Sequence, residues 1–319
     1  LIRRYGLEKL DPKSPTSEVS AVKVNERREF EWKVKDTLAS YGMWEVITYD
    51  FVNEDLMKKC RLDVGGSLEV LNALTNDATH MASTILPNLM LNVESNLKNN
   101  ENLSLFRLGY TFSNKGDERA SVAGAFVKNG ESEPYYLAKS VVDELFEDLG
   151  LSINFKRVER SDVYHPGRVA EVLYGKKKVL GHVGELHPEA ADGLGIKCRV
   201  GIFELDFEEI FDLYLKNDES KFEAISSFPS VERDLSMIVE SKMEVSKLLN
   251  AVKNACGGVV SCEVFDVYSG DKMEKGKKSV ALRYVLADSK KTLKEEDISK
   301  ASGLIMEALK KAGAEIREG

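Results

Sequence analysis

The order of hydrophobic periodicities in the last third of the chain narrows the folds that it can adopt. Four short segments have the composition and alternation of strands, and two longer ones place apolar residues at helical spacing. In chain order they are residues 234–240, 244–256, 259–268, 278–287, 294–312 and 314–317. The resulting order, β-α-β-β-α-β, predicts a ferredoxin-like split unit. Thr292 and Glu295 have the spacing of a capping box, which predicts the start of the second helix.

Upstream, helices are mixed among mostly sequential strands, which predicts an α+β domain with an antiparallel sheet. We expect helices at residues 26–41, 82–97 and 135–150, and strands at 44–52, 103–112, 120–128, 153–158, 169–175, 178–186 and 199–207. The buried face predicted for the third helix consists of Leu137, Val141, Leu145 and Leu149. A stretch that contains proline and serine and a later polar stretch divide the chain into a leading segment at 1–15, a first domain at 16–220 and a second at 221–319.

Composition excludes several classes of protein. The apolar runs are too short for a transmembrane helix, and the N-terminus lacks the apolar core of a signal peptide. The first residue is Leu rather than Met, which suggests a piece of a longer protein. The four cysteines are scattered without a CxxC pair, as expected for reduced thiols in the cytoplasm. The net charge is −8, but residues 222–319 carry equal numbers of basic and acidic residues and repel a polyanion less.

Three of the four histidines raise the question of a zinc site. A zinc-protease helix needs two histidines four residues apart with a glutamate between them. His182 and His187 are five apart, and Gly184 lies between them in a segment that runs from a strand into a turn. A metal site would therefore require His165 and Glu185 to converge through the tertiary fold. The two His–Pro pairs, each at a junction of strand and loop, instead indicate turns.

Other catalytic motifs are also missing. The sequence has no GxSxG elbow, no GxxxxGK[ST] phosphate loop and no GxGxxG turn after a strand. Its many carboxylates carry no information by themselves. We therefore expect no catalytic residue in this chain.

The motifs of the chain, taken in order, resemble one family of proteins. The segments "FPSVERDLSMIV", "CEVFDVYSGDKMEKGKKSVALRYVL" and "DSKKTLKEEDI" are similar to the ferredoxin-fold anticodon-binding domain that ends the β subunit of bacterial phenylalanyl-tRNA synthetase. Upstream, "YGMWEVITYDFV", "MASTILPNLM", "LFRLGYTF", "VYHPGRVAEVL" and "LGHVGELHPE" resemble the family's class II synthetase-like module in the same order. "IRRYGLEKL" resembles the tail of the domain that precedes this module, so the resemblance covers nearly the whole chain.

The resemblance implies that the first domain has a class II synthetase fold but performs no catalysis. Class II catalysis needs a strand with Phe-Arg-x-Glu and a glycine-rich motif with an arginine, because cationic groups stabilise transferring phosphates. Arg107 lacks the following glutamate, and "GIFELDFEEIF" has neither the glycine series nor the arginine. Two residues depart from the family's pattern, Ala82 where Arg is usual and Arg107 where Glu is usual. We expect both to alter local surface contacts but not the fold.

The resemblance also implies partners. We expect tRNA for phenylalanine and a catalytic α subunit, in a cytoplasmic (αβ)2 heterotetramer with no membrane partner. The whole complex uses ATP and magnesium to attach phenylalanine to its tRNA. The family's editing domain and magnesium site precede the region matched here, so no cofactor or metal ligand is expected in this chain. Some apolar surface in residues 16–220 should be exposed for docking.

Strand alternation sorts the candidate RNA-binding residues of the second domain. Phe265 and Val267 should point to one face of their strand, and Asp266 and Tyr268 to the other. Two helices cover one face of such a sheet and leave the other open. Open sheets bind single-stranded RNA by stacking on aromatic side chains and by hydrogen bonds to base edges.

Three residues on that face are candidates for reading the GAA anticodon of phenylalanine tRNA. Asp266 can accept from a guanine, Tyr268 can stack a base, and Ser279 can bond a base edge or a sugar. The resemblance carries anticodon contacts to the same three positions. Arg283 falls on the same face as Ser279. Four lysines beside the following loop are candidate phosphate contacts, namely Lys272, Lys275, Lys277 and Lys278.

Two other functions have distinct consequences. A ferredoxin-fold regulatory protein that senses a small molecule would be stabilised by its ligand and indifferent to RNA. A metallohydrolase would contain stoichiometric zinc after purification.

Overall fold

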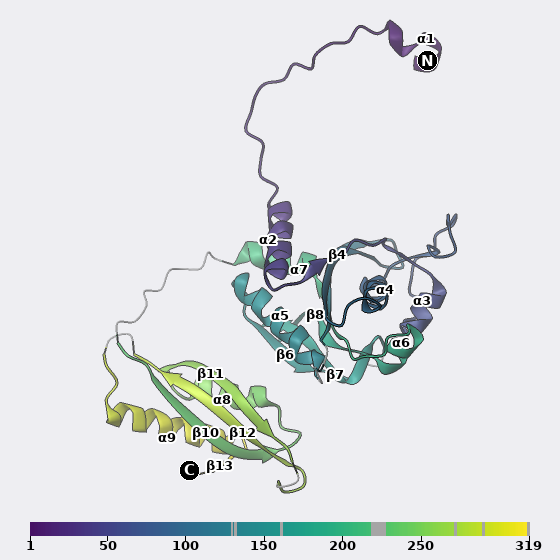
Figure 1. Cartoon of the computed structure of the whole chain (residues 1–319). Coiled ribbons are helices and arrows are strands. Elements are labelled where there is room, and N and C mark those ends of the chain that lie inside the picture. The colour runs from purple at the N-terminus through teal and green to yellow at the C-terminus, as the bar shows by residue number, and fades with distance from the viewer. Residues whose placement is uncertain are drawn as a thin grey trace. The chain divides into compact units, whose positions relative to one another are not determined.

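The structure of the protein is a computed structural model, which describes residues 1–128, 130, 133–159, 162–217, 228–270, 273–288 and 291–317. The chain divides into two compact units, Leu1–Ser220 and Lys221–Gly319 (Figure 1). A short helix α1 (Ile2–Tyr5) and a 3-10 turn η1 (Leu7–Lys9) lie in the exposed leading segment. No helix within the described ranges is both long and apolar enough to cross a bilayer.

A seven-stranded sheet forms the centre of the N-terminal unit, in the order β1-β4-β5-β9-β8-β7-β6. The strands are β1 (Trp44–Glu45), β4 (Leu103–Phe112), β5 (Glu118–Val127), β6 (Ile153–Arg157), β7 (Tyr164–Tyr174), β8 (Lys178–Leu186) and β9 (Gly201–Asp206). The pair β1 and β4 is parallel, whereas the other neighbouring pairs are antiparallel. A separate small sheet pairs β2 (Phe51–Val52) with β3 (His80–Met81). The predicted α+β class is confirmed, and the large sheet is mixed because of its short parallel edge strand.

Helices cover both faces of this sheet, and each face is lined by its own core. One face carries α3 (Glu54–Lys59), α4 (Leu86–Leu97) and α6 (Pro188–Gly193), and the other carries α2 (Glu26–Ser40), α5 (Pro134–Asp148) and α7 (Phe207–Lys216). Figure 1 shows α4 end-on beside β4 and β8. The interior of this unit is therefore packed on both sides of the sheet.

The segment predicted as one strand at residues 44–52 is divided between two sheets. Its first residues pair with β4, and its last pair with β3. Between them, the Asn88 side chain donates to the carbonyl oxygens of Tyr49 and Phe51, each at 2.9 Å. A side chain thus satisfies backbone groups that a neighbouring strand would otherwise satisfy.

The buried face of α5 is turned slightly from the predicted one. Leu145 and Leu149 are buried as expected, but Leu137 and Val141 are only half-buried. Residues four apart drift by about 40° per step around a helix, so a row of four leaves the core. The deeper positions are filled by Ala138, Val142 and Phe146.

The C-terminal unit has the predicted β-α-β-β-α-β order. Its elements are β10 (Val231–Glu240), α8 (Val245–Ala255), β11 (Val259–Tyr268), β12 (Lys277–Leu286), α9 (Glu295–Lys311) and β13 (Glu315–Arg317). The strands form one antiparallel sheet in the order β11-β12-β10-β13. This is the ferredoxin-like arrangement expected from the sequence.

Both helices of this unit pack on one face of the sheet. Met237 and Leu282 of the central strands form the core with Leu248 of α8 and Ile305 of α9. In Figure 1 the strands pass in front of α8 and α9. Because strand side chains alternate, the intervening residues point to the opposite face. Within the described ranges of this unit, no helix packs on that face, which we call the open face.

The predicted capping box of α9 is wrong. The helix begins at Glu295, so Glu295 itself cannot occupy the third position. Instead, the Asp297 carboxylate accepts from the Lys294 backbone N–H at 3.2 Å and pairs with the Lys291 ammonium at 2.8 Å. The carboxylate two residues further along thus supplies the acceptor that the first turn requires.

Candidate nucleic-acid interface

The open face presents its side chains in rows that run across the strands. Residues directly opposite each other in an antiparallel pair point to the same face. The rows are Tyr268 with Ser279 and Ile238, Asp266 with Ala281 and Ser236, and Glu263 with Arg283 and Asp234. The structure therefore brings four predicted residues, Asp266, Tyr268, Ser279 and Arg283, onto one surface.

Tyr268 ends β11 and is 44% exposed. The hydroxyl end of its ring packs against Gly270. A side chain at that position would clash with the ring, since a Cβ there would lie 2.4 Å from the tyrosine hydroxyl oxygen. Asp266 is exposed in the neighbouring row, and Ser279 is half-buried directly opposite the ring. A base stacked on Tyr268 would thus meet a carboxylate acceptor and a hydroxyl nearby.

Arg283 is fixed in position by Asp234 on the adjacent strand. Its Nε donates to Oδ1 of Asp234 at 2.9 Å, and its Nη2 donates to Oδ2 at 3.0 Å. This two-point hydrogen bond raises the pKa of Arg283 and lowers the pKa of Asp234. Such forked pairs define the plane of the guanidinium as well as its position.

The predicted position of Phe265 is wrong. A register shift between Val264 and Asp266 marks a bulge in β11, and Phe265 is its extra residue. The Phe265 ring lies 5.3 Å from the Arg283 guanidinium carbon, on the open face, and is 51% exposed. Val267 instead pairs with Val280, whose side chain faces the helices. A bulge breaks strict alternation, so the two residues do not share a face.

The predicted lysines do not share one surface. Lys277 lies opposite Glu240 on the open face, and its ammonium pairs with Glu274 at 3.1 Å and with Glu315 at 3.4 Å. The hydrogen bond with Glu274 and the nearby carboxylates raise the pKa of Lys277. Lys277 is therefore positioned at the rim of the open face, with its charge already balanced by carboxylates.

Lys278 points to the helix side of the sheet. Its Nζ donates to the Met243 carbonyl oxygen at 2.7 Å, and burial lowers its pKa. Its position does not support the predicted phosphate contact. Lys275 is exposed, and Lys272 lies outside the described residues.

The two His–Pro motifs cap turns of the backbone. Nδ1 of His165 accepts from the Gly167 N–H at 3.0 Å, and Nδ1 of His187 accepts from the Glu189 N–H at 3.1 Å. Burial, followed by the charge of Arg61, lowers the pKa of His187, which keeps the ring neutral as its acceptor role requires. In the part of the chain that the structure describes, no three His, Cys, Asp or Glu side chains are grouped as metal ligands.

Glu185, the carboxylate weighed as a further metal ligand, is buried between two arginines. Arg199 Nε donates to it at 2.8 Å, and Arg168 Nη1 donates to it at 3.3 Å. A buried carboxylate with two such partners is a structural ion pair.

Arg107 and Ala82, the two departures from the family's pattern, lie inside the N-terminal unit. Ala82 is fully buried and Arg107 is 2% exposed, so the expectation of altered surface contacts is wrong. The Arg107 guanidinium forms an ion pair with Asp50 and donates to the Thr48 carbonyl at 3.2 Å. It fits because Gly109 has no side chain, since a Cβ there would lie 2.8 Å from the guanidinium. Arg107 thus serves the packing of this unit.

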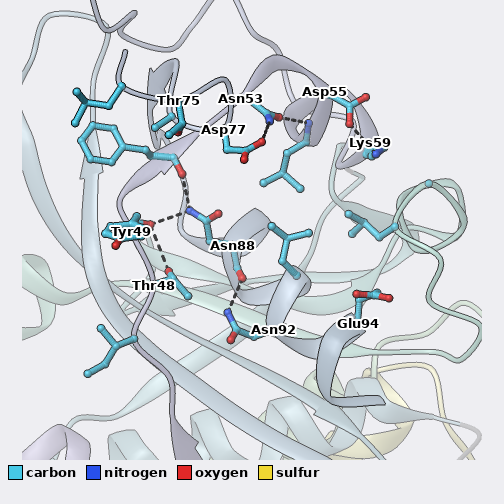
Figure 2. Close-up of a pocket in the computed structure, with 18 residues that line it drawn as sticks. Thr48, Tyr49, Asn53, Asp55, Lys59, Thr75, Asp77, Asn88, Asn92 and Glu94 are labelled. Atoms are coloured by element: carbon cyan, nitrogen blue, oxygen red, sulfur yellow. Dashed lines mark hydrogen bonds and ion pairs between the residues drawn. The ribbon is translucent and has the colours of Figure 1, made fainter. Parts of the chain in front are cut away.

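The N-terminal unit carries an apolar groove of about 1140 Å³ beside α4. Four of its lining residues, Ile47, Tyr49, Leu74 and Leu91, are large, apolar and exposed, up to 99% for Leu74. Figure 2 shows Asn88 in this groove, with its amide joined to the backbone at Tyr49. Trp44, at the start of the same segment as Ile47 and Tyr49, is 75% exposed. We call these five exposed residues the apolar patch.

Sequence reasoning missed several residues of both surfaces. Asp234 and Phe265 position Arg283, but cross-strand register and a bulge decide this, and neither is visible in one strand. The apolar patch was expected but not located. Its indication in the sequence is "WEVITY". In this strand-like segment, large apolar residues occur at both even and odd positions, whereas a strand with a single buried face needs them at only one of the two.

Comparison with known proteins identifies two domains. Residues 10–207 match the family model of the phenylalanyl tRNA synthetase beta chain CLM domain, and residues 226–317 match that of the ferredoxin-fold anticodon binding domain.

The curated relatives of the chain are named phenylalanine–tRNA ligase beta subunit. The chain is 31% identical to the phenylalanine–tRNA ligase beta subunit of Carboxydothermus hydrogenoformans over 90% of this chain and 38% of the relative. It is 31% identical to that of Staphylococcus epidermidis, over 99% of this chain and 41% of the relative. It is also 31% identical to that of Fusobacterium nucleatum, over 100% of this chain and 42% of the relative. The chain thus spans about two fifths of the length of these relatives.

Solved structures show the same fold. A crystal structure of pyrrolysyl-tRNA synthetase from Desulfitobacterium hafniense matches 63% of this chain and 74% of its own with a TM-score of 0.51 and 13% identity. A second structure of that enzyme matches 62% and 73% with a TM-score of 0.50. At this identity the match concerns the fold alone. With a family model that covers more than half of its residues, the chain belongs to the phenylalanyl-tRNA synthetase β chain family.

Proposed function

We propose that this chain is the anticodon-binding and subunit-docking part of a phenylalanine–tRNA ligase. The open face binds the anticodon of tRNA for phenylalanine, and the N-terminal unit docks a catalytic α subunit in a cytoplasmic (αβ)2 assembly. ATP and magnesium act in the whole enzyme, while this chain contributes no catalytic residue or cofactor. The observation that carries the proposal is the convergence of Asp266, Tyr268 and Ser279 on the uncovered face of an anticodon-binding fold.

The chemistry of the open face suits a single-stranded guanine. A base that stacks on the exposed Tyr268 ring presents its donor edge toward Asp266, an acceptor when ionised. Ser279 is opposite Tyr268 and supplies a hydroxyl to a base edge or a sugar. This pairing of stacking with an acidic acceptor favours guanine in the first anticodon position over adenine, whose six-membered edge lacks that donor pattern.

The non-catalytic role of the N-terminal unit is supported by its packing. Both faces of the large sheet are covered by helices and lined by apolar cores. Arg107, the arginine on the strand where class II enzymes bind ATP, is buried against Asp50 and so is withdrawn from any phosphate. The exposed apolar patch supports docking, because large apolar surfaces on a soluble domain mark interaction sites.

The proposal is tested by fluorescence anisotropy of a labelled anticodon stem-loop titrated with the 319-residue chain. We expect a GAA loop to bind more tightly than an AAA loop, with an affinity that falls as salt rises. Tyr268→Ala should weaken GAA binding by roughly 5- to 150-fold, the equivalent of about 1–3 kcal/mol of stacking. Equal affinity for both loops and for the Tyr268 variant would contradict anticodon recognition by the open face.

Lys277 and Lys278 provide a matched control for the face that binds RNA. They are adjacent lysines on opposite faces of β12, so their alanine variants change the same charge at nearly the same place. Lys277→Ala should reduce the slope of log affinity against log salt, but by less than the value of about one for a full phosphate contact, because Glu274 and Glu315 already balance much of the charge of Lys277. Lys278→Ala should leave that slope unchanged. The opposite result would assign RNA to the helix side of the sheet.

Docking is tested by tryptophan fluorescence. The chain has two tryptophans, Trp32 and Trp44, and both lie exposed in the N-terminal unit. Titration with the catalytic α subunit should shift their emission to the blue as the patch is buried. Ile47→Asp should abolish the shift, whereas Tyr136→Asp, at an exposed aromatic of α5 outside the patch, should not. Loss of docking with the Tyr136 variant alone would place the interface elsewhere.

A further inference from the structure

The open face carries a second flat aromatic and cationic surface besides Tyr268. Phe265 is turned onto this face by the bulge in β11, and Arg283 lies against its ring at 5.3 Å. Asp234 holds the guanidinium from the other side with hydrogen bonds of 2.9 and 3.0 Å. The three residues come from three adjacent strands, and their contacts hold the guanidinium in a fixed position; we call this group the Arg283 platform.

The charges around the platform argue against a phosphate contact. Asp234 pairs with Arg283 directly, and Glu263 lies opposite Arg283 in the same row. Two carboxylates beside one guanidinium leave no excess positive charge for a phosphate. What the platform still offers is a guanidinium plane, and bases of single-stranded RNA stack on such planes as they do on aromatic rings.

The distance between the two surfaces shows how an RNA strand must approach them. Ser279, opposite Tyr268, and Arg283 are four residues apart on β12, which corresponds to about 14 Å along an extended strand. Stacked nucleotides repeat every ~3.4 Å, so one stacked pair of bases cannot span the two surfaces. The strand must be unstacked and laid along β12, with a base on each.

We propose that the Arg283 platform is a second stacking site of the RNA-binding face, and that it holds a neighbouring anticodon base of the strand whose first base lies on Tyr268. This inference rests on the proposed anticodon recognition. It assigns Arg283 the role of a stacking surface, with Asp234 and Phe265 as its positioning residues. Because stacking tolerates any base, the platform adds affinity while Asp266 and Ser279 supply selectivity.

The test uses the 319-residue chain and four labelled anticodon stem-loops, one intact and three with a single abasic anticodon nucleotide. Phe265→Ala and Arg283→Lys should each weaken the intact loop by about 5- to 10-fold, although Arg283→Lys keeps the charge. Val260→Ala, which removes an exposed apolar side chain from the same strand, is the control and should have no effect. One abasic loop, with the missing base at the second or third anticodon position, should bind both platform variants as tightly as it binds the unchanged chain, because the base that stacks on the platform is absent.

The outcomes separate this inference from the proposed function. If Tyr268→Ala weakens binding but neither platform variant does, anticodon recognition stands and the platform is overturned. The platform is also overturned if Arg283→Lys binds normally while Arg283→Ala lowers the salt slope by about one, because that pattern marks a phosphate contact. An equal loss with every abasic loop would likewise overturn it. If the unchanged chain binds no stem-loop at low salt, both proposals fail.

Discussion

The seven-stranded sheet of the N-terminal unit and the four-stranded sheet of the C-terminal unit differ in how many of their faces are covered. The large sheet of the N-terminal unit is packed by helices on both sides, and even its arginine at position 107 is buried. The four-stranded sheet of the C-terminal unit is packed by helices on one side, and its other side presents rows of polar and aromatic residues. A sheet with two buried faces can offer a partner only its edges and the loops around it. A sheet with one free face can offer the face itself.

The two units expose large apolar and aromatic side chains in different places. In the N-terminal unit, the five residues of the apolar patch lie on the segment around β1 and the groove beside α4, while others, such as Trp32 and Tyr136, lie elsewhere. In the C-terminal unit, Phe265 and Tyr268 lie on the open face. The proposed function therefore places protein docking at the segment around β1 and the groove beside α4, and RNA binding on the open face of the C-terminal sheet.

The largest expected effect is on the stability of the N-terminal unit, whose large sheet is covered on both faces. Asp50→Ala leaves the Arg107 guanidinium buried without its carboxylate, and breaking a buried ion pair in this way costs about 3–5 kcal/mol. Urea unfolding followed by tryptophan fluorescence measures the change, because both tryptophans lie in this unit. The double variant Asp50→Ala with Arg107→Leu should recover much of the loss. Full stability of Asp50→Ala would mean that the pair does not hold the segment after β1 in place.

A second prediction contrasts the two faces of the C-terminal sheet. Leu282→Ala removes a fully buried side chain from the helix side and should lower the free energy of unfolding of this unit by about 2–5 kcal/mol. Ser279→Ala, on the open face of the same strand, should change it by less than about 0.5 kcal/mol. Hydrogen exchange of the β10 and β12 amides measures both. Comparable losses would show that the open face is also covered in solution.

The smallest expected effect is on the pH dependence of the stability of the N-terminal unit. The pKa of His187 is lowered by burial, below its ordinary value of about 6.5. The stability that its neutral ring contributes is therefore fully present above about pH 6.5 and is lost as the pH falls through the lower folded value. Protonation also removes the helix cap at Glu189, worth about 0.5–2 kcal/mol. His187→Asn, which caps without titrating, should lose less stability than the natural chain between pH 7.5 and 5.5 in urea unfolding.

Local sequence patterns predicted most of the fold. Helical and strand periodicities located nearly all the long elements, including the β-α-β-β-α-β order, because each pattern reflects burial within one element. These patterns failed where side chains distant in the sequence determine the backbone conformation. The strand predicted at residues 44–52 is interrupted by the Asn88 amide and by the attraction of Asp50 to Arg107. The helix α7 was missed because its first residues continue directly from β9.

The candidate site could be predicted only in part. Alternation placed Asp266, Tyr268, Ser279 and Arg283 on one face, because Asp266 and Tyr268 both lie after the bulge in β11, and Ser279 and Arg283 lie in a regular stretch of β12. It misplaced Phe265, since the bulge that turns this residue is a property of the pairing with β12. The partner of Arg283 and the helix-side position of Lys278 likewise depend on register and packing, which the residues of one strand do not reveal.

The most direct test of the account is a map of the RNA-bound face by NMR. Backbone amide shifts of the 319-residue chain would be recorded during titration with the GAA anticodon stem-loop. We expect the largest changes at Asp266, Tyr268, Ser279 and Arg283, with little change in α8, α9 or the N-terminal unit. Changes concentrated on α8 and α9, with the open face unaffected, would contradict the assignment of RNA binding to that face.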